Sequence, residues 1–147
     1  MSHAPGRVEL LGNHTDYNEG VVLSAAIDRG VTVHGRARDD KRVELTSLAL
    51  EKRVEVAVDA FEKQTEESWA NYALGVVRVF GERGYEMGGF SMEVVSDLPI
   101  GAGLSSSAAF EVATATFLKK LFRWKIERQT GLRANLRRRR RRRCWLR

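Results

Sequence analysis

The chain has 147 residues, of which 43% are hydrophobic and 30% are charged, and its formal net charge is +6. A chain of this length can form one ordinary domain with a sizeable core. It contains no apolar run of membrane-spanning length and no signal-peptide core, and its one cysteine excludes an internal disulfide. We therefore expect a cytoplasmic protein that does not bind a membrane.

The positive charge is concentrated at the C-terminal end. Residues 123–147 contain twelve Lys or Arg and one Glu, whereas residues 1–122 contain thirteen Lys or Arg and eighteen Asp or Glu. We predict a folded domain over residues 1–121 and a disordered, Arg-rich tail over residues 122–147. Because arginine has many GC-rich codons, we interpret the tail as a frameshift product. The run Arg137–Arg143 leaves open an arm that binds nucleic acid non-specifically through phosphate contacts.

The first part of the domain has the pattern of strands. Short apolar runs at Val8–Leu11 and Val21–Leu23 flank a polar stretch. Apolar residues then alternate with polar ones, as in half-buried antiparallel strands, at Val31, Val33, Val43, Leu45, Val54, Val56 and Val58. A helical stripe over Trp69–Phe80 and an alternating strand over Phe90–Val94 follow. The order predicts an α+β fold, with helices packed on one face of a mainly antiparallel sheet.

The stretch PIGAGLSSSAAFEVATATFL, Pro99–Leu118, places glycines and serines before a second helix. The helical spacing is carried by Ala109, Val112, Ala113, Thr116, Phe117 and Leu121. Ser105, Ser106 and Ser107 therefore fall at the N-cap or in the first turn, where unpaired amides and the helix dipole attract anions. Gly101 and Gly103 let backbone amides approach a phosphate. The alternative is a Gly/Ser linker, and the lysine of the common P-loop is missing.

A second dense stretch, APGRVELLGNHTDYNEG, runs from Ala4 to Gly20. Its polar side chains lie on an expected turn between two glycines, and they include Asn13, His14, Thr15 and Asp16. Such short hydrogen-bonding groups suit a ligand with many hydroxyl groups. Arg7 lies just upstream, in a strand that leads into the same loop. The alternative is an Asx-rich turn that only closes a hairpin.

Together these stretches resemble one enzyme family. GRVELLGNHTDYNEG resembles the galactokinase signature, PIGAGLSSSAA resembles the loop with which GHMP small-molecule kinases hold the phosphates of ATP, and WANYALGVV, Trp69–Val77, is similar to the galactokinase helix between them. The resemblance covers residues 4–121. It implies the N-terminal domain of a GHMP kinase, which is an α+β fold.

The resemblance also implies an activity, the transfer of the γ-phosphate of ATP to the anomeric hydroxyl of galactose. Arg7 would stabilise charge near the transferred group, and Asn13, His14, Thr15 and Asp16 would bind galactose or a related hexose. The ATP phosphates would be held by Gly101, Ala102, Gly103, Leu104, Ser105, Ser106 and Ser107. Ser107 would also be a ligand of Mg²⁺. Such groups suit phosphoryl transfer, which depends mostly on positioning and charge neutralisation.

Two departures from the family pattern limit these expectations. Asn13 stands where the family usually has a glutamate, so a charge-assisted hydrogen bond to the sugar is lost. Nothing after Leu121 resembles the family, and the aspartate expected as general base belongs to that part. We therefore expect a truncated fragment that is inactive alone. The alternatives are a non-catalytic sugar- or nucleotide-binding module and a nucleic-acid binder acting through the Arg tail.

Overall fold

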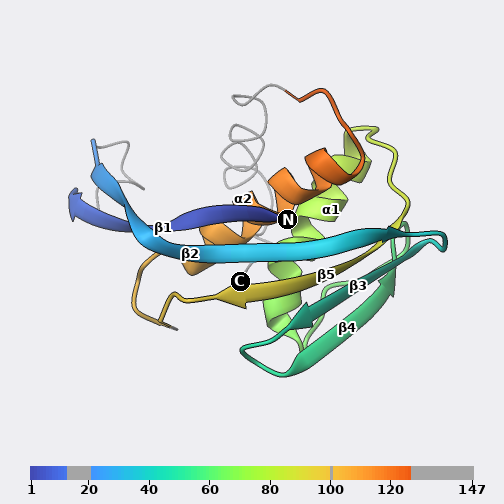
Figure 1. Ribbon diagram of the computed structural model, residues 1–147, viewed down its shortest axis with the longest axis horizontal. Coiled ribbons are helices and arrows are strands. Elements are labelled where there is room, and N and C mark those ends of the chain that lie inside the picture. The colour runs from blue at the N-terminus through green and yellow to red at the C-terminus, as the bar shows by residue number, and fades with distance from the viewer. Residues whose placement is uncertain (13–20, 100, 127–147) are drawn as a thin grey trace.

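The computed structural model describes residues 1–12, 21–99 and 101–126, and in this part of the chain the strands form one mixed sheet backed by helices (Figure 1). The strands are β1 (Ser2–Leu11), β2 (Leu23–Arg38), β3 (Arg42–Ser47), β4 (Lys52–Ala57) and β5 (Gly89–Ser96). The helices are the 3₁₀ turn η2 (Ser68–Ala70), α1 (Asn71–Glu82) and α2 (Ser106–Leu121). Neither α-helix is long and apolar enough to cross a membrane.

The sheet has the strand order β1-β2-β5-β3-β4. The pairs β1–β2, β2–β5 and β3–β4 are antiparallel. The pair β3–β5 is parallel, because the chain passes through β4 and α1 before β5 enters between β2 and β3. The prediction of a mainly antiparallel sheet is therefore confirmed.

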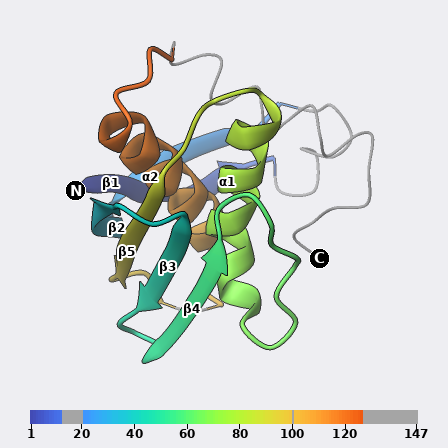
Figure 2. The same cartoon turned by 90° about the vertical axis from the view of Figure 1, so that its right-hand side faces the viewer.

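Both α-helices cover the same face of the sheet (Figures 1 and 2). Helix α2 contacts β1 and β2, and α1 packs against α2. The ring of Phe117 on α2 lies 6.0 Å from that of the fully buried Phe90 on β5. Between the helical elements, Trp69 stacks on Phe110 at 6.5 Å. The hydrophobic core thus lies between one sheet face and the helices, as predicted.

The core-facing stripe of α2 differs from the one read from the sequence. Val112, assigned to the stripe, is 43% exposed, whereas Phe110, Thr114 and Leu118 are buried beside Phe117. The buried face of α2 is therefore turned away from Val112 and is wider than predicted. The reason is that α2 packs against β1, β2 and α1 together.

The first two strands are longer than the apolar runs that suggested them. β1 begins at Ser2, and Ser2, Ala4 and Gly6 face inward while the residues between them are exposed. These small residues carry little hydrophobic signal, but they allow α2 to approach closely. β2 begins at Leu23, so Val21 lies outside it.

The packed part of the chain continues beyond the predicted boundary at Leu121. Trp124 lies 5.0 Å from the rings of both Phe80 and Tyr85, and its Nε1 donates a hydrogen bond to the Glu86 carbonyl at 3.2 Å. Phe122 and Ile126 also pack against the core. The order or disorder of residues 127–147, including Arg137–Arg143, lies outside the described residues.

Candidate functional site

The glycine–serine loop leads directly into α2. Ser105 is the N-cap residue, in a left-handed conformation with φ 58° and ψ 36°, and Ser106 and Ser107 begin the helix. This is the position predicted for the three serines. The Ser105 hydroxyl makes no capping hydrogen bond, so no N-cap side chain occupies the first amides of α2. These amides and the helix dipole remain suited to an anion.

The two loop glycines are required by the backbone and not by packing. Gly101 and Gly103 have φ values of +75° and +70°, a region that other L-residues rarely adopt. A Cβ atom added at either residue would meet nothing within 4 Å. Ala102 between them is also exposed, so the loop opens to solvent in front of α2. A bulky charged group has room to approach there.

The loop touches the strand that carries Arg7. The backbone N–H of Arg7 donates to the Leu104 carbonyl at 3.0 Å. The Arg7 side chain is half-exposed, and within the described part of the chain its Nη2 lies 3.8 Å from Glu9 Oε2. Thus the backbone of Arg7 and the loop, far apart in sequence, are adjacent in space.

A close approach of backbones at Gly6 makes this contact possible. A Cβ atom on Gly6 would lie 2.6 Å from Leu98 Cδ2 and 3.0 Å from the Leu104 carbonyl oxygen. Sequence reasoning gave Gly6 and Leu98 no role, because no local pattern shows that two distant segments will meet. The one available signal was a glycine directly before Arg7.

The predicted sugar ligands Asn13, His14, Thr15 and Asp16 lie outside the described residues. The strands on either side are described, and Leu11 pairs with Leu23 across the hairpin. Both ends of the predicted sugar loop are therefore held together next to β1. The roles of the four residues stay predictions.

The charges that perturb one another most clearly lie away from this loop. Hydrogen bonding to Arg38 lowers the pKa of the Asp40 carboxyl, and hydrogen bonding to Arg42 lowers the pKa of Glu55. Lys52 likewise lowers the pKa of Glu67. In residues 1–12, 21–99 and 101–126, no three His, Cys, Asp or Glu side chains gather into a metal-binding group. Ser107 as a Mg²⁺ ligand therefore stays a prediction.

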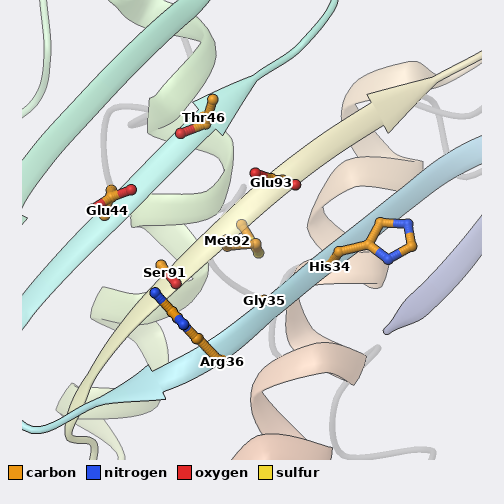
Figure 3. A pocket seen from close by; sticks show the side chains of 8 residues that line it. All are labelled: His34, Gly35, Arg36, Glu44, Thr46, Ser91, Met92 and Glu93. Carbon is orange, nitrogen blue, oxygen red and sulfur yellow. The ribbon is translucent and has the colours of Figure 1, made fainter.

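A polar trough crosses the sheet face opposite the helices (Figure 3). Its lining comes from β2, β3 and β5 and comprises His34, Gly35, Arg36, Glu44, Thr46, Ser91, Met92 and Glu93. None of the site residues predicted from sequence lies there. Because its charged side chains are one arginine, Arg36, and two glutamates, Glu44 and Glu93, the trough has the character of a solvated sheet face and not of an anion site.

Two protein-family models match the segments that contain the predicted sugar loop and the glycine–serine loop. The galactokinase galactose-binding signature matches residues 1–37, a stretch that includes Arg7 and positions 13–16. The GHMP kinases N-terminal domain matches residues 71–139, which includes the glycine–serine loop and α2.

Individual relatives agree with these matches. The chain is 44% identical over 126 residues to a galactokinase of Thermococcus kodakarensis and 41% identical over 128 residues to one of Staphylococcus carnosus. These alignments cover 86% and 85% of this chain but 35% and 33% of the relatives, so the chain spans about a third of their length.

Solved structures show the same relationship. Lactococcus lactis galactokinase complexed with galactose superposes with a TM-score of 0.82 at 36% identity, covering 90% of this chain and 35% of that one. Methanococcus jannaschii mevalonate kinase, at 20% identity and a TM-score of 0.78, shares the fold over 90% of this chain and 44% of its own. The chain is therefore galactokinase-like in sequence and has the fold of the GHMP kinase N-terminal domain.

Proposed function

We propose that this chain forms the nucleotide-binding and sugar-binding part of an ATP-dependent galactose 1-kinase. The observation that carries the proposal is the loop before α2, where two left-handed glycines lead to an uncapped helix N-terminus beside the strand of Arg7. This arrangement offers backbone amides and a cation to a triphosphate.

Each predicted residue then has a distinct task. Gly101–Ser107 would hold the phosphates through backbone amides and serine hydroxyls, and Arg7 would neutralise charge on the γ-phosphate during transfer. Asn13, His14, Thr15 and Asp16 would hydrogen-bond the hydroxyl groups of galactose. The family match to residues 1–37 supports this assignment of the sugar loop.

Magnesium fits the same loop as a companion of ATP. The half-buried Ser107 in the first turn of α2 can supply one neutral oxygen ligand. Mg²⁺ commonly binds through few protein ligands together with phosphate oxygens and water. When bound, the ion would neutralise phosphate charge, and Ser107 would fix its place at the helix terminus.

The nucleotide site can be tested by titrating the chain with a fluorescent ATP analogue and Mg²⁺. Gly103→Ala should weaken binding about tenfold or more, because an alanine resists the left-handed conformation that aims the amides. Gly84→Ala is the matched control, since Gly84 has φ +79° and the same open surroundings but lies at the end of α1. Equal affinities in the two variants would contradict the proposal.

We expect this chain alone to bind the nucleotide without phosphorylating galactose. The family resemblance places the general base in a later part of a galactokinase, and loss of a general base costs about 10²–10⁴-fold. The measurement is galactose 1-phosphate formation, with Ser107→Ala as the background. Turnover clearly above that background would instead show that the chain is a complete kinase.

A non-catalytic binding module is the second candidate, supported by the chain's span of about a third of its relatives. Adding the rest of a galactokinase as a separate polypeptide distinguishes the two, because only a chain that is part of a kinase should then form product. In such a complex, Asn13→Glu should change hexose preference more than the Michaelis constant for ATP. We propose a cytoplasmic location for either function.

A further inference from the structure

Asp97 holds the segment that leads into the phosphate loop, the glycine–serine loop Gly101–Ser107, against β2. This residue follows β5 and directly precedes Leu98. Its Oδ1 accepts a hydrogen bond from the backbone N–H of Gly30 at 2.6 Å, and its own N–H donates to the Gly30 carbonyl at 3.3 Å. The Arg29 guanidinium adds a bond from Nη1 to the Asp97 carbonyl at 3.4 Å. Three hydrogen bonds thus join one loop residue to two neighbours on β2.

The attachment point is an irregularity of the sheet. The β1–β2 register steps from Pro5 opposite Gly30 to Arg7 opposite Ala26, so β2 carries extra residues at this place. Bulges of this kind often re-aim a strand beside a functional site. Here the irregularity lies immediately before Arg7, and the Gly30 N–H, on a buried residue, needs an acceptor.

The exit of the loop is fastened to the opposite strand. The Leu104 carbonyl accepts the N–H of Arg7 on β1 at 3.0 Å. At the entrance, the buried Leu98 side chain also lies against Gly6 of β1. The loop is therefore anchored at both ends on either side of one bulge. Its position relative to Arg7 depends on both anchors.

The charge of Asp97 by itself would disfavour a triphosphate in the adjacent loop, since like charges repel. A carboxylate at this place is therefore explained by the hydrogen bond that it accepts. We propose that Asp97 is a positioning residue, which locks the phosphate loop to β2 so that the helix amides and Arg7 face the same phosphate group. This inference rests on the proposed nucleotide-binding function.

The test compares three variants in binding of a fluorescent ATP analogue with Mg²⁺. Asp97→Ala removes the acceptor and should weaken binding about tenfold, because the Gly30 N–H loses its partner. Asp97→Asn keeps an oxygen acceptor without the charge and should bind at least as tightly as the wild type. Asp28→Ala is the control, because Asp28 is an exposed carboxylate on β2, two residues before Gly30, and the substitution should not weaken binding. A purely electrostatic role of Asp97 predicts tighter binding for Asp97→Ala. The direction of the change in nucleotide affinity therefore distinguishes a positioning role from an electrostatic one.

Hydrogen exchange of the peptide covering residues 98–105 supplies a readout that needs no nucleotide. Asp97→Ala should exchange faster than Asp28→Ala, while Asp97→Asn should match the wild type, with thermal unfolding as a check on the fold. The proposal is overturned if Asp97→Ala matches Asp28→Ala in exchange, or if it binds nucleotide as tightly as the wild type. Failure of the wild-type chain to bind nucleotide would refute the proposed function, and exchange alone would then decide the anchoring role.

Discussion

The two ends of the sheet are built differently. At the β3–β4 end, the outward face carries paired charges, with Arg42 Nε 2.6 Å from Glu55 Oε1 and Arg53 Nη2 2.8 Å from Glu44 Oε2. At the β1–β2 end, large apolar side chains are exposed around the predicted sugar loop. These are Leu10, Leu11, Val21 and Leu23, and Val21 is 92% exposed. In Figure 1 this end of the ribbon reaches past the helices.

The difference is between a surface whose charges are paired within the sheet and a surface suited to contact with another molecule. Charged side chains on β4, an edge strand, discourage pairing with other chains. Several large apolar residues exposed at one end of a sheet are instead typical of a surface that contacts another molecule or domain. The same sheet therefore has one end whose outward face is covered by ion pairs and one end that exposes more large apolar side chains, although Leu48 and Leu50 in the β3–β4 turn are exposed as well.

The largest effect is expected from disturbing the charged end at Gly89. A Cβ atom there would lie 1.9 Å from the Asp40 carbonyl oxygen and 2.8 Å from that of Arg42, both backbone atoms. Gly89→Ala should lower the free energy of unfolding by about 2–3 kcal/mol, as overpacking does, measured by urea denaturation. Gly75→Ala, inside α1 with nothing within 4 Å, should instead be neutral or stabilising. Similar destabilisation by both substitutions would contradict the close approach at Gly89.

The next effect concerns association through the apolar end. We expect the chain to self-associate, and Leu11→Lys with Val21→Lys to weaken this at least about tenfold, because each large apolar side chain contributes about 1.5–3 kcal/mol when buried. Sedimentation equilibrium measures the association constant of each variant. The control is Leu48→Lys with Leu50→Lys, which changes two exposed leucines in the β3–β4 turn. A monomeric wild type, or equal effects of the two pairs, would remove the distinction between the ends.

The smallest effect is the response of the charged end to acid. Folding lowers the pKa of Asp40 and Glu55 below their ordinary values of 3.8 and 4.5. Their stabilising contribution is therefore complete above those values and is lost as the pH falls through the lower folded values. The melting temperature should fall below about pH 4.5, and Arg38→Met should make that fall shallower. An identical acid dependence in Arg38→Met would show that these exposed ion pairs are irrelevant to stability.

Local patterns allowed most of the elements to be predicted. The alternation of Val43 and Leu45, and of Phe90 and Met92, identified strands, because one buried sheet face imposes a period of two. The three serines were placed at the start of α2, because their position before a helical stripe has a local cause. The stripe on α2 was predicted less well, since its orientation depends on partners distant in sequence.

The candidate site divides in the same way. The sequence by itself indicated the resemblance to galactokinases, predicted an anion site in the Gly101–Ser107 loop and placed glycines where the backbone of that loop is left-handed. Only the tertiary structure decided that this loop lies against Arg7, that Gly6 permits the contact and that Asp97 fastens the loop to β2. The reason is physical. Helix starts and left-handed turns depend on neighbouring residues, whereas a hydrogen bond between distant strands exists only after the sheet has brought them together.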